Sequence, residues 1–244
     1  MDFFARKERG GGDRVDEGFL SGTPLFKDMD RKDVQDMLAC LGSYTKTYEK
    51  GAFIFREGER TQSMGMVLSG SVHIETEDFW GNRSIISDIG PGELFGEAYA
   101  CLKDEPLMVN VQAVSRTKVL FLEMGKVIRI CPRSCPCHSR LIDHLLMIMA
   151  RKNLLLSHRI LHTMPKTIRE RLLAYLSYLS VRQEGNWVTT PFNRQQMADY
   201  LNVDRSALSA EIGRMQKEGL IEVEKNRFRI RGSSPNVGPT SKNA

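Results

Sequence analysis

Residues 191–230, PFNRQQMADYLNVDRSALSAEIGRMQKEGLIEVEKNRFRI, contain the pattern that decides the fold. Apolar residues at helical spacing predict a short helix over 195–201 and, after a tight turn, a second helix over 204–217. The Asp204 carboxylate is suited to cap the second helix, and Gly219 is suited to end it. Two β-like runs, LIEVE and RFRI, follow. This order predicts a winged helix-turn-helix.

The residue types in this element favour DNA binding. A recognition helix enters the major groove with its N-terminal end first, and Arg205 stands there, able to donate two hydrogen bonds to guanine O6 and N7. Arg194, at the start of the first helix, is suited to a phosphate contact. In the alternative, a module that binds protein, Arg205 pairs with an acidic neighbour. The expected DNA-binding residues are Arg194, Asp204, Arg205, Ser206, Ser209, Lys225 and Arg227, with Arg229 beside them on the wing.

Composition and charge agree with this prediction. The 244 residues are 41% hydrophobic and 27% charged, which is typical of a globular chain. Residues 1–150 carry 19 basic and 22 acidic side chains, whereas residues 151–244 carry 16 and 8, so the basic excess lies in the second part. No apolar run approaches the roughly 20 residues that span a bilayer, so we expect no membrane segment. Residues 1–18 lack a signal-peptide pattern, so we expect a cytoplasmic protein.

Before this element, the sequence pattern changes from helical to β-rich. Residues 27–41 have apolar residues at helical spacing. From residue 45 to about 127, the runs AFIF, GMVL, SVHI, RSII, VNVQAV and KVLFL alternate with glycine-containing turns. Many short strands at regular spacing predict an antiparallel β-roll or a jelly-roll-like sandwich. The expected fold class is therefore α+β.

A long helical pattern without Gly or Pro covers residues 138–162. Ile142, Met149 and Leu156 lie seven residues apart, with Leu145, Leu146 and Ile160 beside them, which favours a seam with a second helix in a dimer. The alternative is a helix that packs on its own domain. The expected domains are an arm over 1–22, a sensor domain over 23–130, a cysteine cluster and dimerisation helix over 131–164 with a hinge at 162–165, a winged helix over 165–231 and a disordered tail over 232–244.

This organisation resembles the CRP/FNR superfamily of bacterial transcription regulators over residues 24–231. The resemblance is carried by Leu68-Ser69-Gly70, by GPGELFGE at 90–97 and by NRQQMADYLNVDRSALSAEIGRM at 193–215. It implies a cyclic-nucleotide-binding-like roll, a homodimer bound to a near-palindromic operator in double-stranded DNA, and RNA polymerase as a further partner. Two recognition helices would read half-sites about 34 Å apart.

One departure from the family bears on the effector. In relatives that bind cyclic nucleotides, a Gly-Glu pair is followed further along by an Arg that pairs with the cyclic phosphate. Gly96 and Glu97 are present here, but the Arg position is Leu107 and the next is Met108. The loop lacks a bidentate phosphate clamp, which argues against cyclic AMP. In one interpretation, the loop closes a more apolar pocket for a small organic effector, and Leu156 and Ser157 reach into it from the long helix predicted over 138–162. In the other, the loop packs as core without a ligand.

Three cysteines and a histidine follow one another closely as Cys131, Cys135, Cys137 and His138. Thiolates and imidazole suit zinc or an iron–sulfur cluster. The spacing matches no well-known zinc pattern, and FNR-type sensors hold their cluster mostly through N-terminal cysteines, which residues 1–39 lack. A metal site, a reversible thiol switch and unliganded cysteines all stay open. Cys40 is expected to be a small core residue.

No constellation for catalysis stands out in the sequence. It contains no HExxH, no recognisable Ser/His/Asp set and no phosphate-cradling glycine loop, so we do not expect an enzyme. The expected function is an effector- or redox-responsive, homodimeric DNA-binding regulator. The alternative is a sensor module that acts on a protein partner.

Overall fold

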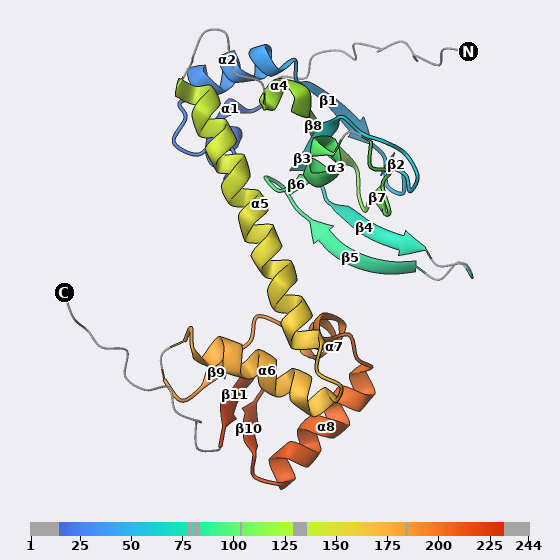
Figure 1. Ribbon diagram of the computed structural model, residues 1–244, viewed down its shortest axis with the longest axis vertical. Helices are drawn as coiled ribbons and strands as arrows, with labels where there is room; N and C mark the ends of the chain where they lie inside the picture. The colour runs from blue at the N-terminus through green and yellow to red at the C-terminus, as the bar shows by residue number, and fades with distance from the viewer. Residues whose placement is uncertain are drawn as a thin grey trace, which may run out of the picture. The chain divides into compact units, whose positions relative to one another are not determined.

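The structure, a computed structural model, describes residues 15–77, 80, 83–102, 104–128, 136–183 and 185–231. Its contacts divide the chain into a first unit, residues 1–150, and a second unit, residues 151–244. Helix α5, Pro136–Thr163, crosses this boundary without a break (Figure 1). The first unit contains two antiparallel sheets, and the second contains helices and a small sheet, so the α+β class predicted from the sequence is confirmed.

The first unit is built on two four-stranded antiparallel sheets. The sheet of order β1-β8-β3-β6 consists of β1 Tyr44–Tyr48, β8 Thr117–Glu123, β3 Ser63–Ser69 and β6 Leu94–Phe95. The sheet of order β2-β7-β4-β5 consists of β2 Phe53–Phe55, β7 Asn110–Ala113, β4 Val72–Glu77 and β5 Arg83–Ile89. The sequence predicts all of these strands except β1, whose run YTKTY is mostly polar, and β6, which is too short for an alternating pattern.

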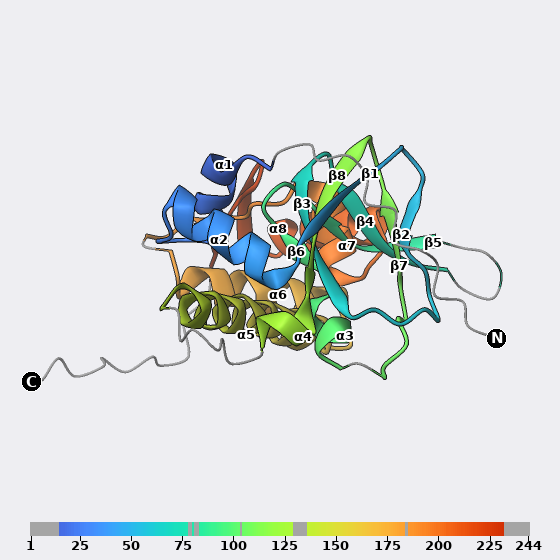
Figure 2. The ribbon, with the colours of Figure 1, turned by 90° about the horizontal axis from the view of Figure 1, so that it is seen from above.

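Inside the β1-β8-β3-β6 sheet, strand β8 is buried on both faces. On β8, Val119 and Phe121 belong to the core between the two sheets, whereas Leu120 and Leu122 belong to the core that the helices cover. Because successive side chains of a strand point to opposite faces, this continuous apolar run requires cover on both sides. Figure 2 shows helices α1, α2 and α5 together on one side of the strands.

A glycine permits close packing inside this sheet. Gly65 on β3 pairs with Phe95 on β6. A Cβ atom built on Gly65 would lie 2.2 Å from the Cζ atom of Phe95, so the aromatic ring occupies the space of the missing side chain. The ring of Phe95 also lies 5.7 Å from that of Phe55 in an edge-on arrangement. Phe95 thereby connects the two sheets.

Short helices cover the outer face of the first sheet. They are α1 Glu17–Ser21, α2 Arg31–Leu41, α3 Glu97–Cys101 and α4 Met124–Val127. Helix α2 begins where the Asp30 carboxylate accepts the Asp33 N–H and ends at Gly42, which is left-handed with φ 61°. The prediction of a flexible arm over residues 1–22 is wrong for residues 15–22, because α1 forms there and Leu20 is fully buried. Residues 1–14 lie outside the described ranges.

The two halves of α5 have different surroundings. Leu145 is buried in the first unit's core and Met149 packs against it, so these two residues belong to their own domain and not to the predicted dimer seam. Other large apolar side chains of α5 are exposed, among them Met147 in the first half and Leu154 and Leu161 in the second, at seven-residue spacing. No helix among the described residues is both long and apolar enough to cross a membrane.

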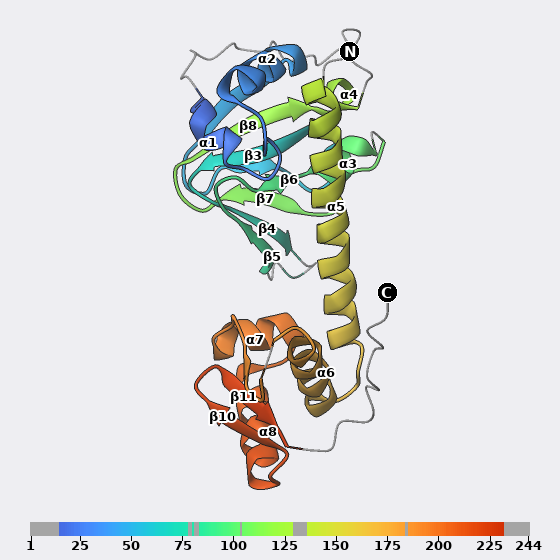
Figure 3. The same ribbon diagram turned by 90° about the vertical axis from the view of Figure 1, so that its left-hand side faces the viewer.

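The second unit has helices α6, α7 and α8 packed on a three-stranded sheet of order β10-β11-β9. Figure 3 shows these helices beside β10 and β11. Its elements are α6 Ile168–Ser180, β9 Val188–Thr189, α7 Arg194–Leu201, α8 Arg205–Lys217, β10 Ile221–Glu224 and β11 Arg227–Ile230. Leu208, Ile212 and Met215 of α8 are buried in its core, as the helical spacing predicts. The sequence misses β9, because two residues carry no periodic signal.

Candidate nucleic-acid interface

Helices α7 and α8 meet at a tight turn that the local sequence specifies. Asn193 caps α7 in a capping box with Gln196. Asn202 ends α7 in the left-handed region with φ 53°, which asparagine tolerates better than most residues. The Val203 N–H then donates to the Ala198 carbonyl at 3.0 Å. These contacts close the helix-turn-helix that the sequence predicts.

A residue that sequence reasoning missed holds the turn from α6. Arg171 donates from Nη1 to the carbonyl oxygens of Leu201, at 3.2 Å, and Asn202, at 2.9 Å. Its Nε donates to the Pro165 carbonyl at 2.8 Å. The last carbonyl groups of a helix have no N–H donor within the helix, and Arg171 supplies the donors for those of α7. No local signal identifies this role, since the partners lie about thirty residues away in the chain.

The start of α8 is fixed by Asp204. Its carboxylate accepts the Ala207 N–H at 2.9 Å and also the Ser206 hydroxyl. The Ser206 hydroxyl and the Ala207 N–H both stabilise the anion, so the pKa of Asp204 is lowered from its ordinary value. Two of the predicted DNA-binding residues, Asp204 and Ser206, therefore bond to each other in the DNA-free chain.

Arg205 and Ser209 lie free on the surface of α8. Both side chains are exposed. Within the described ranges, neither makes a hydrogen bond and Arg205 makes no ion pair, so the alternative in which Arg205 pairs with an acidic neighbour is wrong. Arg205 occupies the first residue of the helix, directly after its cap. A guanidinium at this place can meet an incoming anion or base edge without first breaking an internal pair.

Arg194 is less accessible than the sequence predicts. Its guanidinium lies 5.5 Å from the ring centroid of Phe228, on strand β11, so the side chain joins the start of α7 to the wing. Its Nη1 is buried with no partner among the described residues. Burial lowers the pKa of this guanidinium from its ordinary value. Only part of Arg194 faces solvent.

The wing offers fewer unpaired cations than the sequence predicts. Lys225, at the hairpin tip with φ 56°, is exposed and makes no ion pair within the described part of the chain. Arg227 is exposed and lies 3.8 Å from the Glu224 carboxylate. Arg229 pairs with Glu222 at 2.6 Å, so its expected place in a phosphate-facing strip is wrong.

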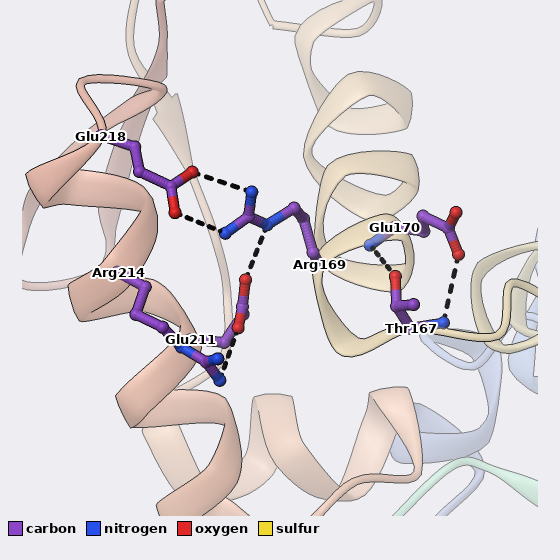
Figure 4. A network of polar contacts seen from close by, with 6 residues as sticks. All are labelled: Thr167, Arg169, Glu170, Glu211, Arg214 and Glu218. Atoms are coloured by element: carbon purple, nitrogen blue, oxygen red, sulfur yellow. Dashed lines mark hydrogen bonds and ion pairs between the residues drawn. The ribbon is translucent and has the colours of Figure 1, made fainter.

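A network of ion pairs fixes α8 on α6 (Figure 4). Arg169 donates from Nε to Glu211 at 2.7 Å, and from Nη1 and Nη2 to Glu218 at 2.8 and 2.9 Å. Arg214 approaches the other Glu211 oxygen at 2.7 Å. The Glu211 carboxylate is buried, and the hydrogen bonds from Arg169 hold the pKa of Glu218 below its ordinary value. Sequence reasoning missed this network, because its partners are far apart in the chain.

The predicted effector residues of the first unit lie on two adjoining segments. Gly96, left-handed with φ 73°, precedes α3, and a Cβ atom there would lie 2.9 Å from the Phe55 ring. Glu97 is buried at the first position of α3. Leu107 is buried and its N–H donates to the Glu59 carbonyl at 2.8 Å, whereas the Met108 side chain is exposed.

Leu156 and Ser157 lie on α5 in the second unit. Both are exposed, and the Ser157 hydroxyl donates to the Asn153 side chain at 3.3 Å. Their expected part in an effector pocket with the first unit stays a prediction.

The cysteine cluster lies partly outside the described residues, since Cys131 and Cys135 fall in the gap between residues 128 and 136. Cys137 packs partly buried against the first unit's core. The His138 ring is buried, its Nε2 lies 2.7 Å from the Val127 carbonyl, and its Nδ1 has no partner among the described residues. Those residues contain no group of three or more His, Cys, Asp or Glu side chains that could hold a metal. Cys40 is exposed, so its predicted core place is wrong.

Comparisons with known proteins match both units. Residues 45–134 match the family model for the cyclic nucleotide-binding domain, and residues 170–232 match that for the Crp-like helix-turn-helix domain. The first covers the two sheets of the first unit. The second covers the helix-turn-helix and the wing.

Two relatives and one solved structure illustrate the similarity. The chain is 27% identical over 221 residues to the transcriptional activator protein FnrA of Stutzerimonas stutzeri, covering 86% of each chain. It is 31% identical over 103 residues to the cyclic AMP receptor protein of Thermus thermophilus, which is 42% of this chain and 46% of that one. The c-di-GMP-responsive regulator CLP of Xanthomonas campestris matches with a TM-score of 0.53 at 17% identity, over 84% of this chain and 100% of that one, and shares the fold.

Proposed function

Because the chain belongs to the CRP/FNR superfamily of DNA-binding transcription regulators, we propose that it reads operator DNA as a homodimer whose affinity responds to a signal received by the first unit. The relatives named above are transcription regulators, and we assign no enzymatic activity to this chain. We expect it to act in the cytoplasm and to contact RNA polymerase as a further partner.

One observation carries the DNA-reading part of this proposal. Arg205 is exposed and without an ion pair among the described residues, at the first position of a helix that Asp204 caps and that Arg169 holds in place. The N-terminal end of a recognition helix is the part that enters the major groove. Ser206 and Ser209 lie on the same turn or the next, within reach of bases or phosphates.

The phosphate contacts would come from both sides of this helix. Lys225 and Arg227 on the wing are exposed, and a phosphate would replace the long contact between Arg227 and Glu224. Arg194, at the start of α7, would add a contact helped by the helix dipole. Its partly buried guanidinium gives it a second role, as packing between α7 and Phe228.

The homodimer is supported by exposed apolar side chains on α5. Leu146, Leu156 and Ile160 are 64%, 61% and 61% exposed. Several large apolar side chains exposed on one helix about 42 Å long are unusual on a monomer surface. A second copy of the same helix would cover these side chains, and two copies of α8 would then read two half-sites about 34 Å apart.

The signal site has two candidates in the first unit. We favour a metal ion or cluster held by His138 with Cys131, Cys135 and Cys137. The Nε2–H of His138 donates to the Val127 carbonyl, which leaves the lone pair on the buried Nδ1, an atom without a partner among the described residues. A histidine that ligates a metal commonly has its other nitrogen bonded to a carbonyl in this way. The second candidate is a small organic effector near Gly96, Glu97, Leu107 and Met108, with Leu156 and Ser157.

The test of the DNA-reading role is Arg205→Ala. Duplexes would first be selected from a random-sequence pool with the full-length protein, because its operator is unidentified. We expect the variant to bind the selected duplex more weakly by about 1–3 kcal/mol and to lose preference at one guanine position. Binding would be measured by fluorescence anisotropy over a range of salt concentrations, where phosphate contacts produce a steep loss of affinity.

The matched control is Arg116→Ala, which removes an equally charged, exposed side chain from the first unit. It should leave affinity and base preference unchanged. An Arg205→Ala protein with the affinity and preference of the wild type would remove Arg205 from the recognition role.

A further inference from the structure

An aromatic cluster lies inside the second unit, where the end of α5 packs on α6 and α7. The His162 ring is 4.8 Å from the Tyr178 ring, 5.5 Å from the Tyr175 ring and 5.9 Å from the Tyr200 ring, measured between centroids. His158, one turn earlier on α5, lies 4.7 Å from Tyr178. His162 is only 3% exposed. DNA reading as described above uses none of these rings.

Two hydrogen bonds hold the cluster together. His162 Nδ1 lies 2.8 Å from the Tyr200 hydroxyl, and His158 Nδ1 lies 3.1 Å from the Tyr178 hydroxyl. Tyr200 stands in the last turn of α7, directly before the turn that leads to α8. The bond between His162 and Tyr200 therefore ties the end of α5 to the first helix of the helix-turn-helix.

The direction of this bond depends on the proton of the imidazole. Burial, with the neighbouring Tyr178, raises the pKa of Tyr200, so its hydroxyl keeps its proton. A neutral His162 with its proton on Nε2 then accepts the Tyr200 O–H at Nδ1. A protonated imidazole carries N–H groups on both nitrogens and accepts nothing. Protonation therefore reverses the bond, since the imidazolium Nδ1–H donates to the Tyr200 hydroxyl oxygen. The Tyr200 O–H then loses its acceptor and a charge stands on a ring that is almost fully buried, which disfavours the packed arrangement.

The charged groups around His162 oppose its protonation. His158 and Arg159 lie on its own helix, and Arg182, which follows α6, stacks over Tyr178 at 3.8 Å. The pKa of His162 is lowered by burial first, and then by His158 and Arg182. Tyr175, Tyr178 and Tyr200 are the neutral groups that face it. From α7, the Asp199 carbonyl accepts from Arg159 at 3.3 Å and its carboxylate accepts from the Gln195 side chain at 2.8 Å.

We propose that His162 is a positioning residue that ties α7 to the end of α5 while its imidazole is neutral and releases α7 when it is protonated. Acid would then loosen the helix-turn-helix at its first helix and weaken DNA reading. The statement about DNA rests on the proposed function, whereas the statement about α7 does not. Because the pKa of His162 is lowered in the folded chain, the tie is complete above about pH 6.5, the ordinary histidine value, and is lost as the pH falls below it.

The test measures hydrogen exchange of the α7 backbone amides in the full-length protein at about pH 7.5 and about pH 5.5, corrected for the chemical exchange rate. We expect wild-type protection of α7 to fall at the lower pH, by at most about tenfold, because pH 5.5 lies about one unit below the ordinary histidine pKa. His162→Gln keeps an acceptor for Tyr200 that does not titrate, so its protection should be the same at both pH values. His73→Gln, in the first unit, is the matched control and should keep the wild-type response.

A His162→Gln protein with the wild-type loss of protection would overturn the proposal. Tyr200→Phe is a second test of the bond between His162 and Tyr200, and it does not depend on how His162→Gln folds. It removes the hydroxyl and should leave α7 poorly protected at both pH values, whereas wild-type protection in this variant would also overturn the tie. Binding of the selected duplex at both pH values completes the test. A chain that shows the exchange response but binds no DNA would refute the proposed function and support the tie.

Discussion

Arg169 connects α6 with two carboxylates, that of the buried Glu211 on α8 and that of Glu218 at the C-terminal cap of α8. Arg169→Met keeps the aliphatic stem but leaves Glu211 with the exposed Arg214 alone. An underpaired buried carboxylate is costly, so we expect the second unit to melt about 3–8 °C lower. Trp187 fluorescence in a Trp80→Phe background would follow this transition, since the chain has two tryptophans.

Arg214→Met is the matched control for this change. Arg214 is exposed, and its pair with Glu211 is of the i,i+3 kind, which contributes little to stability. We expect its melting temperature to stay within about 1–2 °C of the wild type. Equal melting temperatures for Arg169→Met and the wild type would show that Arg169 does not hold α8.

Residues that act locally could be predicted from the sequence, and residues that act over a distance could not. Asp204 is a cap because of the three residues that follow it, so the sequence alone identifies it. Arg169 and Glu211 are 42 residues apart, and only the packing of α6 on α8 brings them together. The partial burial of Arg194 has the same origin, because Phe228 belongs to the wing.

At the scale of elements, α5 provides the next prediction. We expect the double variant Leu156→Glu, Ile160→Glu to be a monomer, because each exposed apolar side chain becomes a charge in the proposed seam. Sedimentation velocity over a range of protein concentrations would measure the change. Binding to the selected duplex should weaken at the same time, because a monomer presents one recognition helix to the DNA and not two.

Leu155→Glu is the control on the same helix. Leu155 lies nine residues, about two and a half turns, from Leu146, so its side chain points away from the face that contains Leu146, Leu156 and Ile160. We expect this variant to stay dimeric. A dimeric double variant would exclude the face of α5 that contains Leu156 and Ile160 as the interface.

The periodicity of α5 predicted a helix correctly and assigned part of its face wrongly. A seven-residue repeat fits a seam with a second chain and a seam with the helix's own domain equally well. Leu145 and Met149 turned out to pack on the first unit because α1, α2 and the outer sheet face need cover there. Only tertiary structure separates the two cases.

At the scale of the whole molecule, the proposed metal centre links signal and DNA. Protein purified without oxygen should contain stoichiometric zinc, or iron with acid-labile sulfide. His138→Gln retains a donor for the Val127 carbonyl but loses the Nδ1 ligand, so it should lose metal. Because binding linkage is reciprocal, removal of the metal by a chelator should change the affinity for the selected duplex.

Cys40→Ser is the control for metal content, since Cys40 is exposed and far from the cluster in sequence. It should bind as much metal as the wild type. A metal-free wild-type protein would contradict the metal centre and leave the organic effector near Glu97 as the remaining candidate. Absorption spectra and metal analysis would decide between the two.

The contact between Gly65 and Phe95 constrains how this chain can evolve. Any side chain at residue 65 would need the space that the Phe95 ring fills. A substitution of Gly65 is therefore expected only after a change of Phe95 to a smaller residue, or together with it. The two positions form an epistatic pair, in which a substitution that is harmful alone becomes acceptable in the company of the other. In a lineage that keeps the phenylalanine, the glycine is expected to be invariant.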